Sequence, residues 1–211
     1  GEMDSAINVL RETPNFSKPA ANDDLPSAIE RVNVTLLMAK IFRNSSADYH
    51  QQYIEALIQA RVFQLPVLNK LRGETPETVQ AQRQIAAMIC LELGDLYSAQ
   101  HNTDKALGFY NEALKHDEVN DKAMLSLAKL YLSKGDVDAC EHQCNTLLRI
   151  NPTCEEAIMI LADIMFRKNR YEDAAFHFLQ LLDKKADNFT AMVQYVQLLR
   201  RAGHLSEATQ V

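Results

Sequence analysis

The sequence predicts an all-α fold, a right-handed superhelix (α-solenoid) of stacked helix-turn-helix repeats. One observation is a period of 34 residues, in which Gly94, Ala128, Ala162 and Val196 each open the same local pattern. Another is the low content of 6 Gly and 6 Pro in 211 residues, which leaves little room for strands and their turns. A fixed period of this length is the sequence signature of a helical array, in which each unit buries its apolar face against its neighbours.

Small and large residues recur at fixed offsets in each period and predict how the helices pack. A small residue on the first helix, such as Gly94, lets the second helix of the same unit approach closely. A small residue on the second helix, such as Ala174, likewise lets the first helix approach closely. A larger side chain there would overpack the contact between the two helices. Large residues such as Tyr97 fill the space between units. The positions expected to define this packing are Gly94, Tyr97, Ala106, Tyr110, Ala128, Tyr131, Cys140, Cys144, Pro152, Ala162, Ala174 and Phe178.

The first part of the chain predicts long helices with a less regular pattern. Residues 27–43 carry apolar side chains at helical spacing. The next helix, over about 47–71, could bend at Pro66, which has no amide donor. Thr75 is a suitable hydroxyl cap for a third helix that extends to about residue 100.

The second part of the chain predicts shorter helices in a regular register. They are expected over 103–116, 120–133, 136–149, 154–168, 171–184, 188–202 and from 205 onward. The turns inside the units fall at one recurring place, occupied by His101, Gly135, Asn169 and Gly203. Gly and Asn adopt a positive φ at low cost, which suits this reversal. Bases near helix ends, such as Arg201, are interpreted as partners of the helix dipole rather than as a ligand patch.

These patterns divide the chain into three segments. Residues 1–26 are interpreted as the end of a truncated repeat plus a loop, and residues 27–86 as an irregular repeat with long helices. Residues 87–211 are interpreted as three regular repeats and part of a fourth, which stops shortly after Ala208. Because natural arrays end in polar capping units, the sequence predicts a fragment of a longer array.

Composition and charge exclude several classes of partner. A formal net charge of −6 argues against nucleic acid or an anionic membrane surface. No apolar run approaches the roughly 20 residues that span a bilayer, so direct membrane insertion is not expected. The first residues show no secretory signal, and the 4 cysteines fit a reduced, intracellular protein.

The fixed positions resemble the tetratricopeptide repeat. Its consensus places a large residue, Leu, Gly or Ala, Tyr, Ala, Phe or Tyr, Ala and Pro in that order. The matching residues include Leu93, Gly94, Tyr97, Ala106, Tyr110, Ala113, Leu127, Ala128, Tyr131, Leu147, Pro152, Leu161, Ala162, Ala174, Phe178 and Leu181. The resemblance covers about residues 87–211, and it departs from the pattern at Glu118 and Ala186, which replace the expected Pro.

Longer sequence segments that include the residues between the fixed repeat positions resemble the tetratricopeptide-repeat protein 21 family. They lie at 121–144, 162–189 and 196–208, and residues 59–68 followed by 82–100 are similar to an irregular region of the same family. The resemblance implies a structural scaffold, a segment of the large repeat subunit of intraflagellar transport complex A. It further implies retrograde ciliary transport and ciliary cargo entry, with other complex-A subunits as partners. The implied location is the cytoplasm and the cilium, at the axoneme and the ciliary base.

The sequence shows no catalytic, metal-binding or phosphate-binding motif. Cys140 and Cys144 lie four apart, but a metal site needs about four ligands and no second pair stands at a fitting distance, so both are interpreted as core residues. Cys90 and Cys154 receive the same interpretation. No HExxH spacing and no Gly-rich phosphate loop occurs. We therefore expect no enzyme, no cofactor, no metal and no small-molecule substrate.

The inner face of the array is the candidate partner-binding surface. Its predicted residues are Met88, Leu91, Asp95, Leu125, Lys129, Met159, Asp163, Phe166, Val193 and Gln197. Such a mixed surface could take an amphipathic segment or a neighbouring helix. Packing between units explains several of these residues equally well, so both interpretations stay open.

A clamp for a peptide's terminal carboxylate, found in chaperone adaptors, is not expected. Such a clamp needs Lys, Arg and Asn side chains on successive first helices. The corresponding residues here are Leu91, Asp95, Ser126, Glu156 and Ile160 in one frame, or Leu125, Lys129, Ile160, Thr190 and Gln194 in the next. The alternative function is a general peptide-binding adaptor in another multiprotein assembly, with a peptide held on the inner face near Met159.

Overall fold

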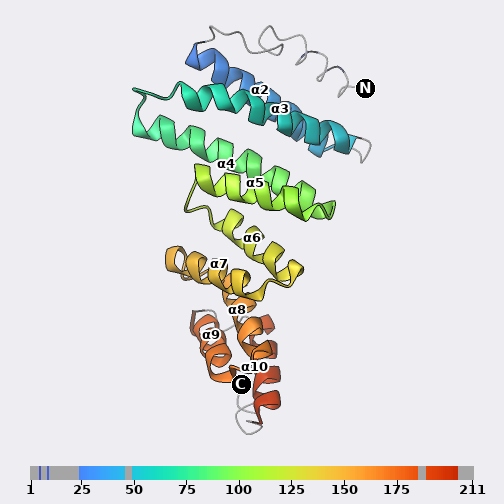
Figure 1. Cartoon of the computed structure of the whole chain (residues 1–211), viewed down its shortest axis with the longest axis vertical. Coiled ribbons are helices and arrows are strands. Elements are labelled where there is room, and N and C mark those ends of the chain that lie inside the picture. The colour runs from blue at the N-terminus through green and yellow to red at the C-terminus, as the bar shows by residue number, and fades with distance from the viewer. Residues whose placement is uncertain (1–4, 6–8, 10–23, 46–48, 185–188, 204–211) are drawn as a thin grey trace. The chain divides into compact units, whose positions relative to one another are not determined.

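The chain folds into helices throughout the residues that the structure describes. The computed structural model describes residues 5, 9, 24–45, 49–184 and 189–203, and these contain no strand (Figure 1). The predicted all-α helical-repeat fold is therefore confirmed. Two predictions lie mostly or wholly outside the described residues: the end of a repeat plus a loop over residues 1–26, of which only 5, 9 and 24–26 are described, and the helix from 205 onward with Ala208.

Contacts divide the chain into two compact units, called here the first unit (residues 1–120) and the second unit (residues 121–211). The first unit contains α2 (Leu25–Arg43), α3 (His50–Asn69), α4 (Pro76–Ala99) and α5 (Thr103–His116). In it, α2 packs on α3, α3 on α4, and α4 on α5. Side chains cap the helix starts: Asp24 Oδ1 accepts from the Ser27 amide at 2.9 Å, and Thr75 Oγ1 accepts from the Thr78 amide at 3.3 Å.

Buried polar contacts accompany the apolar core of the first unit. Its core includes Leu57, Phe63 and Ile89. The Gln64 amide nitrogen donates to the backbone oxygen of Gln82 at 2.9 Å and to its side-chain oxygen at 3.1 Å, which joins α3 to α4. These contacts fix one register between two helices, because a shift along the axis would leave buried polar groups unpaired.

The second unit is built from shorter helices of nearly equal length. They are α6 (Asp121–Lys134), α7 (Val137–Ile150), α8 (Glu155–Arg167), α9 (Tyr171–Lys184) and α10 (Phe189–Ala202). Each packs on the next along the chain in the pairs α6 with α7, α7 with α8, α8 with α9, and α9 with α10. The largest fully buried side chains include Leu127, Leu147, Ile158, Leu161 and Ile164.

The turns between paired helices repeat one backbone geometry. His101 and Asn169 have φ 58°, Gly135 has φ 78° and Gly203 has φ 85°, which confirms the predicted reversal. Three of these turns also close with the same hydrogen bond, from an amide to the carbonyl five residues earlier. These bonds are Asn102 to Tyr97 at 2.9 Å, Asp136 to Tyr131 at 2.9 Å and Arg170 to Met165 at 2.8 Å. This is the Schellman ending of a helix, and it recurs at the 34-residue period.

Helix bounds differ from the predicted ones by small amounts. The helix expected over 47–71 is α3, His50–Asn69, and it continues through Pro66 into its last turn. The helices expected over 103–116 and 171–184 begin and end where predicted. The predicted boundary between residues 86 and 87 falls inside α4, and the division into three segments stays a prediction.

Candidate partner-binding site

The residues predicted to define the repeat packing are mostly buried. Tyr97 and Tyr131 are half-buried, and Pro152 is exposed. The others have low exposure: Gly94, Ala106, Tyr110, Ala128, Cys140, Cys144, Ala162, Ala174 and Phe178. At Gly94 the approach of α5 is close enough that an added Cβ would lie 2.5 Å from Tyr110 Cε1. Glycine suits this position, because a Cβ would force the Tyr110 ring to shift.

Three predicted inner-face residues meet at one pocket in the second unit. Asp163 and Phe166 come from α8 and Gln197 comes from α10, and together they line a pocket of about 130 Å³. The rest of its lining is Ala162, Phe178, Gln194, Leu198 and Arg201. The pocket therefore lies between α8 and α10, the first helices of two successive repeats, with Phe178 of α9 contributing to its lining.

The pocket combines an aromatic wall with amide and guanidinium groups. The Arg201 guanidinium carbon lies 5.1 Å from the centroid of the Phe166 ring, a cation–π contact. Gln194 and Gln197 are exposed, so their amides are accessible to a ligand. Asp163 forms an ion pair with Arg167 at 2.8 Å. Such a lining suits a peptide segment that inserts an apolar side chain and offers backbone groups or a carboxylate to the rim.

The other inner-face residues of the second unit lie away from this pocket. Val193 is 39% exposed, and Met159 and Leu125 are half-buried. Lys129 donates to Glu156, so this cation is already paired within the array. Lys129 is the one lysine at a carboxylate-clamp position when the clamp is aligned from Leu125 and Lys129, and its pairing with Glu156 occupies it.

Of the predicted inner-face residues of the first unit, Asp95 lines a large cavity, and Met88 and Leu91 are not among the residues that line it. Met88 is exposed and Leu91 is half-buried. Asp95 accepts a hydrogen bond from the Tyr110 hydroxyl at 2.7 Å and lines a cavity of about 430 Å³. In the same cavity Tyr53 donates to Glu92 at 2.8 Å, and burial together with this bond raises the pKa of Tyr53 to about 12.

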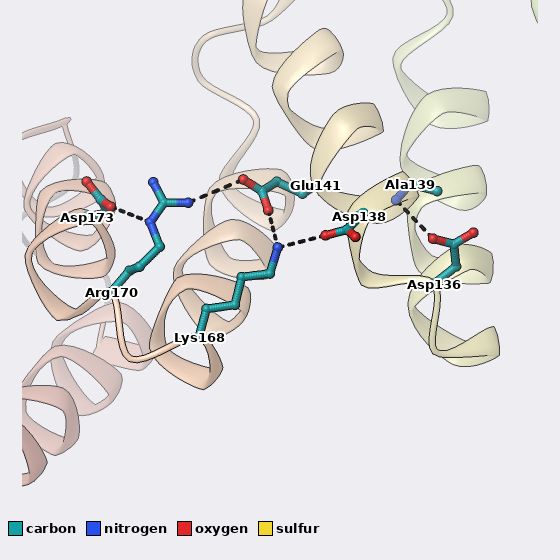
Figure 2. Close-up of polar contacts among 7 residues, drawn as sticks. All are labelled: Asp136, Asp138, Ala139, Glu141, Lys168, Arg170 and Asp173. Atoms are coloured by element: carbon teal, nitrogen blue, oxygen red, sulfur yellow. Dashed lines mark hydrogen bonds and ion pairs between the residues drawn. The ribbon is translucent and has the colours of Figure 1, made fainter.

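An ion-pair network ties the α8–α9 turn to the start of α7 (Figure 2). Lys168 Nζ lies 2.9 Å from Asp138 Oδ1 and 2.7 Å from Glu141 Oε2. Arg170 lies 3.6 Å from Glu141 and 2.7 Å from Asp173. The bonds to Glu141 and Asp138 raise the pKa of Lys168. The network is solvent-accessible and connects successive repeats at their edges.

Sequence reasoning missed a partly buried cluster in the first unit. Cys90 on α4 meets Glu112 and His116 on α5, and Arg61 of α3 donates to Glu112 at 2.8 Å and 3.0 Å. Burial raises the pKa of the Cys90 thiol to about 12, and burial lowers the pKa of His116. The only sequence signal was the spacing of Glu112 and His116, which lie four residues apart on one helix face.

Among the described helices, none is both long and apolar enough to cross a bilayer.

Comparison with protein-family models places the chain among repeat proteins. A model described as the fourth ARM domain of tetratricopeptide repeat protein 21 matches residues 1–114, and the corresponding fifth ARM repeats domain matches residues 155–211. A general tetratricopeptide repeat model matches residues 97–164.

Three curated relatives match between 60% and 96% of the chain. Tetratricopeptide repeat protein 21A of mouse is 38% identical over 203 residues, which is 96% of this chain and 15% of the relative. The human 21A protein is 36% identical over 87% of this chain, and the human 21B protein is 42% identical over 60% of it. The chain spans about one seventh of the length of the 21A relatives, 15% in mouse and 14% in human.

Solved structures share the fold at low identity. MamA matches with a TM-score of 0.56 and 13% identity over 79% of this chain and 90% of its own. The TPR domain of Arabidopsis OM64 matches with a TM-score of 0.51 and 24% identity, over 56% of this chain and 98% of its own. The first TPR of Spaghetti, solved with an HSP90 peptide, gives a TM-score of 0.51 and 20% identity, over 56% of this chain and 93% of its own.

Proposed function

This chain belongs to the tetratricopeptide repeat protein 21 family, and from that premise we propose that it is a scaffold segment of intraflagellar transport complex A. Tetratricopeptide repeats are non-enzymatic modules of protein interaction, and a model of this repeat matches residues 97–164 of the chain. The proposed setting is the cytoplasm and the cilium, where the parent protein supports retrograde transport and cargo entry. The support for this setting is the family resemblance of the strings at 121–144, 162–189 and 196–208.

The pocket between α8 and α10 is the proposed contact with another complex-A subunit. The single observation that carries this is the convergence of Phe166, Gln197 and Arg201 on one pocket of about 130 Å³. Aromatic residues, phenylalanine included, and arginine are enriched at protein interfaces. The occupant we propose is a segment of the partner with one apolar anchor and an acidic group, because Arg201 faces the pocket while Asp163 is paired with Arg167.

Charge reversal of one arginine, with its neighbour as the control, tests this function. Full-length parent protein carrying Arg201→Glu is purified from ciliated cells, and the complex-A subunits that come with it are quantified. Arg200 is the matched control, because it is exposed on the same helix and does not line the pocket. With Arg201→Glu we expect the recovery of complex-A subunits to fall about tenfold, as it does when a binding hot spot is removed.

Two results would overturn the proposal. If the wild-type parent recovers no complex-A subunit, the assignment to this complex is wrong, and recovery of a different assembly would support the general peptide adaptor instead. If Arg200→Glu and Arg201→Glu reduce recovery equally, the pocket is not the contact.

A further inference from the structure

The cluster between α4 and α5, in which Cys90 is buried and Glu112 and His116 are half-buried, contains three different metal-ligating side chains. Cys90 offers a sulfur, His116 a ring nitrogen and Glu112 a carboxylate oxygen, and one ligand atom of each lies within 4.8 Å of the others. We propose that Cys90, Glu112 and His116 bind one zinc ion, which ties α4 to α5 in the first unit.

The spacing of these atoms is close to that of a zinc site. Zinc binds sulfur, nitrogen and oxygen at about 2.0–2.3 Å in tetrahedral sites, so its ligand atoms lie about 3.3–3.8 Å from one another. His116 Nε2 is 4.0 Å from Glu112 Oε1, and a small side-chain rotation closes the difference. A thiolate with an imidazole favours zinc over magnesium or calcium, which take oxygen ligands.

A fourth donor lines the same cavity. Gln64 is 1% exposed, and its Oε1 has no hydrogen-bond partner within the described part of the chain. The cavity of about 10 Å³ is lined by Gln64, Cys90, Glu112 and His116, by Arg61, and by apolar side chains of α3 and α4. This volume is about that of one water-sized sphere, which admits a metal ion and excludes an organic ligand. A zinc ion would satisfy the buried amide oxygen and complete four-fold coordination.

Arg61 is the charged neighbour of the proposed site. Its guanidinium donates to both oxygens of Glu112, at 2.8 Å and 3.0 Å. A carboxylate has about four lone-pair positions, so Glu112 can keep these bonds and still bind a metal. The positive charge of Arg61 opposes the cation, however, and it lowers the affinity of the site. On binding, Cys90 coordinates as a thiolate and releases its proton to the solvent.

Zinc and cobalt titrations of the whole 211-residue chain test the site. After removal of metal with a chelator, zinc affinity is measured by competition with a chromophoric chelator, and cobalt is added to reveal sulfur-to-metal absorption. We expect one zinc per chain and a sulfur–cobalt band. Cys90→Ser should abolish the band and weaken zinc binding by more than about 100-fold, beyond the effect of losing an outer-shell partner. Cys154→Ser, a change at a half-buried cysteine in the second unit, should leave both unchanged.

A second pair of variants keeps the test decisive if Cys90→Ser does not fold. His116→Gln should weaken zinc binding as strongly, whereas Arg61→Gln should tighten it several-fold by removing a repelling charge. Circular dichroism of each variant establishes that it is folded. A wild-type chain that does not bind zinc, or zinc affinity equal in wild type, Cys90→Ser and His116→Gln, would overturn the site and leave the cluster as a buried ion pair packed against a thiol.

Discussion

Helices α2, α3 and α4 of the first unit run for 19, 20 and 24 residues, whereas the helices of the second unit run for 13 or 14 residues. The polar residues counted as buried among the described residues all belong to the first unit: Arg31, Thr35, Gln64 and Gln82. In the second unit the charged contacts lie at the surface, as the network around Lys168 shows (Figure 2).

The two units fix the alignment of their packed helices in different ways. In the second unit small residues at a fixed period, such as Ala128 and Ala162, bring successive helices together, so apolar packing alone selects the arrangement. In the first unit the longer helices lack that period over most of their length. A defined polar partner, such as Gln82 for Gln64, then selects one arrangement because the alternatives leave buried groups unpaired.

The largest effect is expected from a core truncation in the second unit. Leu161 has 0% exposure, so Leu161→Ala should lower the free energy of unfolding by about 2–5 kcal/mol through lost burial and an internal cavity. Hydrogen exchange at increasing urea resolves the two units. Protection in α8 should fall while protection in α3 stays as in wild type. Equal losses in both helices would show that the units do not unfold separately.

A smaller loss is expected where α4 and α5 approach most closely. Gly94→Ala places a Cβ 2.5 Å from Tyr110 Cε1, and overpacking should cost about 1–3 kcal/mol in urea unfolding. Gly108 is the matched control, because nothing lies within 4 Å of a Cβ built there. Gly108→Ala should stabilise the chain by about 0.5–1 kcal/mol through helix propensity. The same sign for both variants would refute the close approach at Gly94.

Removal of the buried amide tests whether polar pairing holds the first unit. Gln64→Leu deletes the hydrogen bonds to Gln82 at 2.9 Å and 3.1 Å but also deletes the unpaired Oε1, so we expect a net loss of about 1 kcal/mol. Calorimetry of this variant is compared with exposed Gln59→Leu on the same helix. A more stable Gln64→Leu chain would show that apolar packing alone can hold α3 on α4.

The smallest effect is expected from the surface network of the second unit. Lys168→Ala removes ion pairs to Asp138 and Glu141, which are accessible to water and screened by salt. Its unfolding midpoint should shift less than that of Gln64→Leu, and the shift should shrink in high salt. A large, salt-independent shift would mean that the second unit depends on this network for its register.

The period explains which features could be predicted from the sequence. The positive φ values at His101, Gly135 and Asn169 follow from a local rule repeated every 34 residues, so the turns were predictable. The pocket was only partly predictable. Phe166 and Gln197 were expected on the inner face, but Arg201 was interpreted as a helix-end base, because the crossing of α8 and α10 decides which side chains meet.

The cluster at Cys90 could not be predicted, for a different reason. Arg61 and Glu112 are 51 residues apart and come from α3 and α5, while Cys90 comes from α4 between them. The 34-residue period covers the end of α4 and all of α5 but not α3, so no spacing rule places Arg61 beside Glu112. Only the tertiary packing of the first unit makes the thiol a neighbour of the carboxylate.

Photo-crosslinking tests most directly whether the α8–α10 pocket holds a partner. A photoreactive side chain replaces Gln197 in the pocket of the full-length parent, or replaces Leu179, which is 50% exposed on α9 outside it, as the control. Irradiation in ciliated cells should join the Gln197 variant to one complex-A subunit and leave the Leu179 variant without that product. Equal crosslinking from both positions, or none from position 197 in an intact complex, would contradict the account.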